Sequence, residues 1–158
     1  MVASTCRFCF NPSAQIACSV GSSRKRLEGK WGVVDVEDCT RAMQQLSSEP
    51  YSLIDPKRSV IRGGSAGGYT TLAIICFKPD AFAAATSLFG IADLRSLAKE
   101  THKFESHYLE KLIGGTLEEI PDVYEARSPV FHADKIKTPL LVGDCLCSVA
   151  HRLNSSLG

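Results

Sequence analysis

The sequence has no apolar run that approaches the roughly 18 residues needed for a membrane-spanning helix. It also has no excess of charge, because 18 Lys and Arg residues against 17 Asp and Glu residues leave a net charge of +1. We therefore predict neither nucleic acid nor a membrane as a partner. Internal repeats and low-complexity tracts are missing too. Hydrophobic residues make up 44% of the 158 residues, so the chain is able to bury the core of one domain.

The cysteines do not suggest a disulfide framework or a metal centre. There are seven, an odd number scattered among core-like positions, which is typical of reduced thiols in an intracellular protein. Cys6-x-x-Cys9 and Cys145-x-Cys147 are the only zinc-like pairs, but the second is spaced too tightly and no paired histidines complete a site. We predict no metal, no cofactor and a cytoplasmic location.

The first 23 residues contain no acidic residue and are rich in Ser, Ala and Cys, a composition that weakly resembles an organelle transit peptide. A plastid or other organelle is therefore the alternative location. We predict three segments: a poorly ordered N-terminal segment over 1–23, a partial catalytic domain over 24–144, and an unrelated C-terminal tail over 145–158.

The remaining pattern alternates short apolar strands with helices. Apolar residues spaced by three and four predict a helix over 32–48. Strands are predicted at 59–62, 82–89 and 139–142, a buried helix at 69–77, and polar helices over 93–126. This order is typical of an α/β protein with a mostly parallel sheet flanked by helices on both faces.

One motif carries chemistry. Gly63-Gly64-Ser65-Ala66-Gly67 matches the G-x-S-x-G nucleophile elbow and stands between a predicted strand and a predicted helix. In an elbow the serine occupies a strained, sharp turn that only neighbouring glycines permit. Ser65 would then be the nucleophile, and the backbone N–H of Ala66 would hold the oxyanion of a tetrahedral intermediate.

Other readings of this glycine-rich stretch fit less well. A phosphate loop needs Lys followed by Ser or Thr after its last glycine, whereas this chain has Tyr69-Thr70. A dinucleotide fingerprint needs G-x-G-x-x-G, which residues 63–68 do not provide. A plain structural turn is the remaining alternative.

Residues 24–142 resemble the catalytic domain of the prolyl oligopeptidase family of serine peptidases, especially acylaminoacyl-peptidase-like and dipeptidyl-peptidase-like members. The segments that carry the resemblance are GKWGVVDVEDC at 29–39, DPKRSVIRGGSAGGYTTL at 55–72, SLFGIADL at 87–94, THKFESHYLEKLIGG at 101–115 and ARSPVFHADKIKTPLLV at 126–142. The resemblance implies an α/β-hydrolase fold, peptide substrates and Ser65 as the nucleophile.

The sequence also departs from that family. Members carry a β-propeller and further strands before GKWG, and a second oxyanion donor comes from those strands; residues 1–23 do not resemble them. After the strand at 139–142 the family continues with a further strand and its catalytic histidine, whereas this chain reads Gly143-Asp144-Cys145. We therefore expect an incomplete α/β-hydrolase fold, of which a shortened gene model or splice form is the simplest explanation.

The histidines decide whether a triad forms. Asp144 directly follows a predicted strand and is the candidate acid, and His151 is the one histidine after it. Seven positions, at most about 23 Å of chain, do not suffice for the strand and helix that normally separate acid from base. His102 and His107 are predicted to be exposed, with a substrate-side role as the alternative, and His132 to be structural.

Three further side chains are predicted to be structural. Trp31 is expected to be a packing anchor and Tyr69 a core residue, with a ligand platform and a cleft-lining position as their alternatives. Arg62 is expected at a sheet edge or in an ion pair.

The leading functional hypothesis is a serine peptidase that acts through an acyl-enzyme on Ser65 but is impaired. The alternative is a non-catalytic fragment without its base, and a small esterase is the weaker third hypothesis. The predicted partners are a peptide substrate and either a second copy of the chain or a full-length relative.

Overall fold

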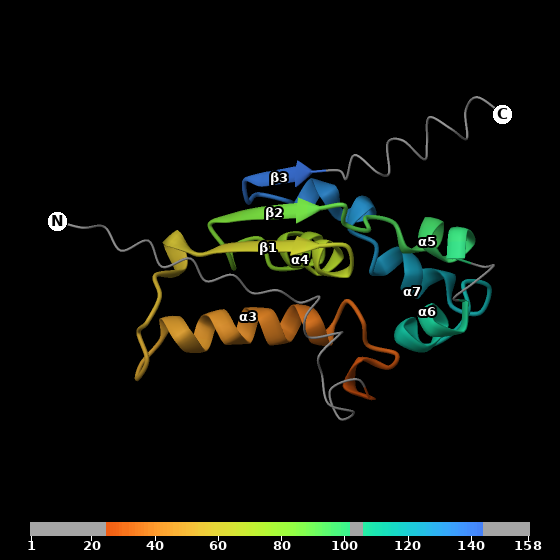
Figure 1. Cartoon of the computed structure of the whole chain (residues 1–158), viewed down its shortest axis with the longest axis horizontal. Coiled ribbons are helices and arrows are strands. Elements are labelled where there is room, and N and C mark those ends of the chain that lie inside the picture. Colours follow the sequence, from red (N-terminus) through yellow and green to blue (C-terminus); the bar gives the residue numbers. More distant parts are fainter. Residues whose placement is uncertain (1–24, 102–105, 144–158) are drawn as a thin grey trace.

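The computed structural model describes residues 25–101 and 106–143. Helices and strands alternate along them, as Figure 1 shows. In chain order the elements are α3 (Val34–Ser47), η1 (Pro56–Arg58), β1 (Val60–Gly64), α4 (Ala66–Phe77), β2 (Ala84–Leu88), α5 (Leu94–Thr101), α6 (Ser106–Ile113), α7 (Pro121–Ala126), η2 (Pro129–Lys135) and β3 (Leu140–Gly143).

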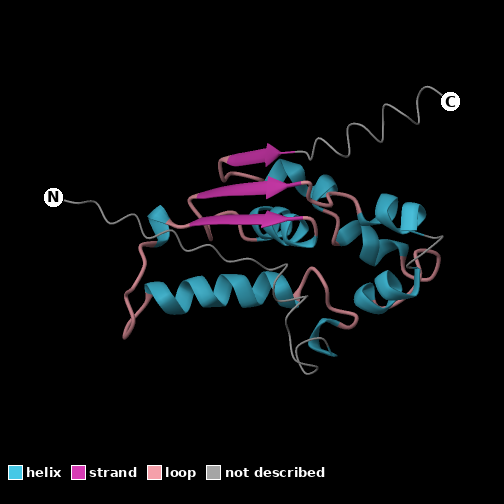
Figure 2. Cartoon of the chain, in the orientation of Figure 1, coloured by secondary structure: helices cyan, strands magenta, loops and turns pink. Residues whose placement is uncertain are grey.

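The three described strands form one parallel sheet in the order β1-β2-β3 (Figure 2). Gly64 pairs with Leu88 and Leu88 pairs with Gly143, so the carboxyl ends of all three strands meet at one edge. Helix α4 packs against β1 and β2, and α3 and η2 pack against α4. Each strand therefore ends at the same edge of the sheet, the edge at which ligands bind in open α/β folds.

The predicted α/β architecture is confirmed, with small shifts of boundary. The helix expected over 32–48 begins at Val34, and the helix expected from Tyr69 begins at Ala66, directly after the serine. Helices were predicted on both faces of the sheet. Within the described ranges α4 covers one face. Side chains of β1 on the opposite face, Val60 and Arg62, are exposed.

Helix α4 is the centre of the core. Ten of its twelve residues are buried, which is why its sequence is apolar all round instead of amphipathic. The fully buried Tyr69 ring lies 4.5 Å from that of Trp31, and its hydroxyl donates to the carbonyl of Arg127 at 3.0 Å. Trp31 and Tyr69 are thus core residues, as predicted.

Arg127 joins three segments that are distant in sequence. Its guanidinium donates to the carbonyl oxygens of Gly29, Trp31 and Ile113 at 3.1, 3.1 and 3.3 Å. The planar guanidinium group of an arginine can bond several carbonyls at once, because its N–H groups point in fixed directions. Half-buried Arg127 therefore fixes the loop before α3 against the end of α6.

Asp35 makes a second link, between α3 and α4. One carboxylate oxygen accepts from the N–H of Gly32 at 2.6 Å and the other from the hydroxyl of Thr70 at 2.6 Å. Burial raises the pKa of this carboxyl, and the hydrogen bonds from Thr70 and Gly32 offset only part of that effect. The carboxyl is therefore more easily protonated in the folded chain than in the unfolded chain.

The terminal segments, membrane-spanning helices and metal sites can be considered only against the residues that the structure describes. Residues 1–24 and 144–158 lie outside them, and so do the proposed segments 1–23 and 145–158. None of the described helices is long and apolar enough to cross a membrane. Across residues 25–101 and 106–143 no three His, Cys, Asp or Glu side chains are grouped so as to hold a metal ion.

We predict that Arg127→Ala lowers the free energy of unfolding by about 2–3 kcal/mol, because three carbonyls lose a charged donor. Urea denaturation of the two proteins measures the difference. Arg41→Ala is the matched control, since Arg41 forms only an exposed pair with Glu37 and should cost less than about 0.5 kcal/mol. Equal losses in the two variants would contradict the assigned role.

A second prediction concerns pH. The folded-state pKa of Asp35 is raised above its usual 3.8, so the folded chain binds more protons and this residue's contribution to stability falls as pH rises from about 4 through that pKa. Asp35→Asn removes this titration. Urea denaturation at pH 4.5 and 7.5 should show the wild-type chain losing stability relative to Asp35→Asn at the higher pH, and a constant difference would refute the raised pKa.

Candidate active site

Ser65 lies on the turn between β1 and α4 in the conformation that an elbow requires. Its φ of 52° and ψ of −121° lie outside the regions that non-glycine residues usually occupy, and the residue is exposed. Its N–H donates to the carbonyl of Leu88, and its own carbonyl accepts from the N–H of Tyr69, both at 3.0 Å. The strand-to-helix turn with a strained serine is therefore present, as the motif predicts.

The neighbouring glycines are explained by close backbone contacts. A Cβ built on Gly63 would collide with the carbonyl of Gly67, so the helix closes directly over the end of β1. A Cβ on Gly68 would come within 2.6 Å of the Cα of Gly90, where α4 meets the segment after β2. Both positions therefore exclude larger residues for reasons of space.

The N-terminus of helix α4, directly after Ser65, is electropositive. Ala66 is the first residue of α4, and N–H groups in the first turn of a helix have no partner within that helix. These groups and the helix dipole favour negative charge at the helix start. The Ala66 N–H is thus placed where an oxyanion donor belongs.

Phe89 forms an apolar wall beside the elbow. It directly follows β2, has a φ of 42°, and is 48% exposed. Its ring lies over Gly64, since a Cβ on that glycine would come within 3.1 Å of the ring. Its N–H donates to the carbonyl of Gly143 at 2.6 Å, so the end of β3 reaches the same neighbourhood.

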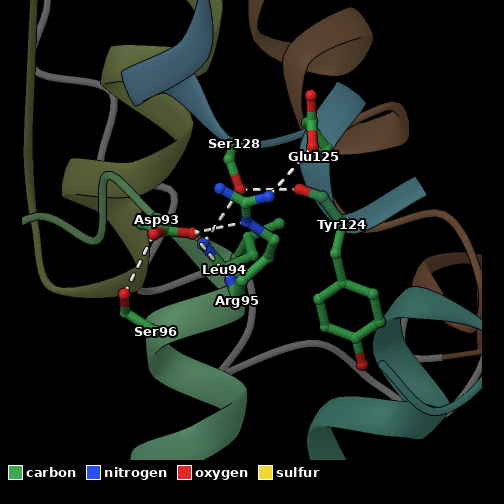
Figure 3. A network of polar contacts seen from close by, with 7 residues as sticks. All are labelled: Asp93, Leu94, Arg95, Ser96, Tyr124, Glu125 and Ser128. Atoms are coloured by element: carbon green, nitrogen blue, oxygen red, sulfur yellow. Dashed lines mark hydrogen bonds and ion pairs between the residues drawn. The ribbon is translucent and has the colours of Figure 1, made fainter. Parts of the chain in front are cut away.

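A polar network fixes the chain that leaves this edge (Figure 3). Asp93 accepts from the Arg95 N–H and the Ser96 hydroxyl, at 2.8 and 2.9 Å, and so caps the start of α5. Arg95 in turn pairs with Glu125 at 2.9 Å and covers the ring of Phe131. The network ties α5 to α7. The guanidinium of Arg95 is occupied by these contacts with Glu125 and Phe131.

The charge of Asp93 is stabilised by this network. Burial raises the pKa of the carboxyl, but hydrogen bonds from the Ser96 hydroxyl and from backbone N–H groups, together with the Arg95 charge, lower it overall. Ser128 closes the network by accepting from the Leu94 N–H and donating to the Tyr124 carbonyl, at 2.9 and 2.6 Å.

The two described histidines do not reach Ser65. His132 packs against Phe77, at the far end of the twelve-residue helix α4 and about 18 Å from the elbow. Its Nε2 bonds the carbonyl of Ala126 at 3.0 Å, so the predicted structural role is confirmed. The fully exposed side chain of His107 meets Glu110. The candidates Asp144, His151 and His102 lie outside the described residues.

Sequence reasoning missed the polar side chains beneath the elbow. The apolar spacing that predicts the helix over 32–48 does not single out Asp35, and Thr70 enters the sequence analysis only as a mismatch to a phosphate loop. Asp35 precedes buried Cys39 by four positions, which places both on the inner face of α3. That spacing was the available signal for a buried carboxylate.

We predict that Gly63→Ala is far more harmful than Gly64→Ala. The first puts a methyl group into the backbone of Gly67 and should cost at least about 2 kcal/mol of stability, whereas the second meets only the movable ring of Phe89. Urea denaturation of both variants gives the comparison. The steric account of the motif is wrong if the two variants are equally stable.

Comparison with known proteins agrees with this geometry. The sequence model of the prolyl oligopeptidase family matches residues 22–145. The acylamino-acid-releasing enzyme of Arabidopsis thaliana is 34% identical over 125 residues, which cover 73% of this chain and 16% of that protein. Dipeptidyl aminopeptidase BIII of Pseudoxanthomonas mexicana is 32% identical over 119 residues, 73% of this chain and 17% of that protein. The chain thus spans about a sixth of these relatives.

Solved structures give the same result. A puromycin-hydrolysing peptidase of Mycobacterium tuberculosis superposes with a TM-score of 0.70 at 53% identity, over 77% of this chain and 18% of that one. A puromycin hydrolase gives 0.68 at 43% identity, over 76% and 18%. The fold is that of α/β-hydrolase peptidases. With a family match over most of its length and a strained serine at the elbow, the chain belongs to the prolyl oligopeptidase family of serine peptidases.

Proposed function

We propose that the chain supplies the nucleophile of a serine peptidase and that Ser65 carries the acyl-enzyme. The observation that supports this most strongly is the strained, exposed Ser65 between β1 and α4, in a chain of this family. The Ser65 Oγ adds to the substrate carbonyl while its proton passes to a base, and the Ala66 N–H stabilises the resulting oxyanion. When this tetrahedral intermediate collapses, the base returns the proton to the leaving nitrogen and the amine departs. Water then hydrolyses the acyl ester on Ser65 and regenerates the serine hydroxyl.

The acid and base of this scheme are sought near the carboxyl end of β3. Gly143 pairs with Leu88, whose carbonyl accepts from the Ser65 N–H, so the chain leaves β3 about 10 Å from the elbow. This supports Asp144 as the acid. His151 is the candidate base, but the short connection from Asp144 argues for impaired base catalysis, and neither described histidine replaces it.

The substrate class that we propose is an amide bond to a short peptide or aminoacyl group. The names of the relatives support it, because they are an acylamino-acid-releasing enzyme, a dipeptidyl aminopeptidase and a puromycin-hydrolysing peptidase. The exposed ring of Phe89 next to Ser65 offers an apolar surface to such a group. An esterase would use the same elbow, so ester and amide substrates must be compared directly.

A fluorophosphonate probe tests the nucleophile, since it reacts with a serine activated by a neighbouring base. We expect the full chain at neutral pH to be labelled slowly, by a factor of about 10³ or more relative to a competent serine hydrolase, and not at all in Ser65→Ala. Ser59→Ala is the matched control and should keep the label, since Ser59 lies at the opposite end of β1.

Labelling that persists in Ser65→Ala would contradict the assigned nucleophile. Rapid labelling that is lost in both Ser65→Ala and His151→Ala would contradict the impairment and identify His151 as the base. Turnover of a peptide amide alongside the matching ester separates the proposed peptidase from an esterase, which would cleave the ester alone.

A further inference from the structure

The first turn of α4 is held by more hydrogen bonds than a helix provides. Each of the three successive carbonyl oxygens of this turn lies within hydrogen-bond distance of a buried side-chain hydroxyl, at 3.2, 2.9 and 3.3 Å. The pairs are Thr70 with Ala66, Thr71 with Gly67 and Ser87 with Gly68. Since Ser65 directly precedes this turn, these bonds restrict the peptide groups that shape the elbow.

Thr70 differs from the other two hydroxyls because it also contacts a buried carboxyl group. Its hydroxyl oxygen lies 2.6 Å from a carboxyl oxygen of Asp35 in α3, so the single Thr70 proton is shared between Asp35 and the Ala66 carbonyl. The other carboxyl oxygen of Asp35 accepts from the N–H of Gly32. Thr70 is fully buried and Asp35 is 5% exposed. A continuous set of contacts therefore runs from the loop before α3 to the carbonyl of Ala66.

A carboxyl group is an expensive choice for a purely structural contact. Burying it without a cation costs more than packing apolar side chains of similar size, and no ion pair of Asp35 is found in the described ranges. The strained Ser65 backbone persists only where its surroundings over-determine it. A polar link directly beneath that strain meets this need, whereas apolar packing has no directional preference.

We propose that Asp35 and Thr70 are a positioning pair that holds the Ser65 turn and the Ala66 N–H in the reactive geometry. The inference rests on the proposed function of Ser65. Neither side chain touches the reacting atoms, so both act through the first turn of α4. Thr70 contacts the Ala66 carbonyl, and Asp35 sets the position of the Thr70 hydroxyl.

The test compares amide hydrogen exchange, read residue by residue by NMR on the full chain, with the rate of fluorophosphonate labelling. The amides of Ser65 and Tyr69 report on the elbow, because they donate to Leu88 and Ser65, and the Ala85 amide reports on the sheet. Thr70→Val should raise exchange about tenfold at the two elbow amides and leave Ala85 unchanged. Labelling of Ser65 should slow by a similar factor.

Four further variants make the test specific. Thr70→Ser keeps the hydroxyl and should restore both readouts, and Asp35→Asn keeps a hydrogen-bonding partner for Thr70 and should behave similarly. Asp35→Ala should resemble Thr70→Val. Thr40→Val is the matched control, since Thr40 is a buried helical threonine whose hydroxyl bonds only within α3. It should leave the elbow amides unchanged.

The outcomes separate this inference from the proposed function. Exchange that rises equally at all three amides, or at none, in Thr70→Val overturns the positioning role. If the wild-type chain shows no labelling of Ser65, the proposed nucleophile fails, while the exchange data still decide whether Asp35 and Thr70 hold the turn.

Discussion

The backbone of Ser65 is the constraint on which the surrounding structure depends. A non-glycine residue at φ 52° and ψ −121° stores about 1–3 kcal/mol of strain, which neighbouring contacts must offset. The serine amide is bonded to the end of β2, its carbonyl to the second turn of α4, and glycines allow the helix to close over β1. The strain is useful because it presents an exposed hydroxyl next to a helix N-terminus.

Two long-range links keep α4 where this turn needs it. Asp35 joins the start of α3 to Thr70, and Arg127 binds the loop before α3 to the end of α6. Tyr69 is held by both regions, since its ring packs against Trp31 and its hydroxyl donates to the carbonyl of Arg127. The elbow thus lies on a helix that is fixed along its sides as well as at its start.

Most of the fold was predictable, because strands with β-branched residues, a helix with an apolar stripe and the glycine motif are local signals. Boundaries were less so: α4 begins at Ala66 instead of Tyr69, since glycines weaken a helix signal although the turn requires them. The strained turn at Ser65 and the start of a helix at Ala66 were also predicted correctly. Phe89 and Arg127 were not, because their importance depends on partners far away in sequence.

The sequence by itself determined the turn. Its glycines, the preceding strand and the following helix are neighbours in the chain, and their steric requirements leave few conformations for Ser65. Only the tertiary structure decided which groups support and surround that turn. The carboxyl of Asp35 meets Thr70, the hydroxyl of Ser87 meets Gly68 and the ring of Phe89 covers Gly64, all by packing between elements that are remote in sequence. Tertiary distance also removed His132 from the candidates for the base, since η2 packs it against the opposite end of α4.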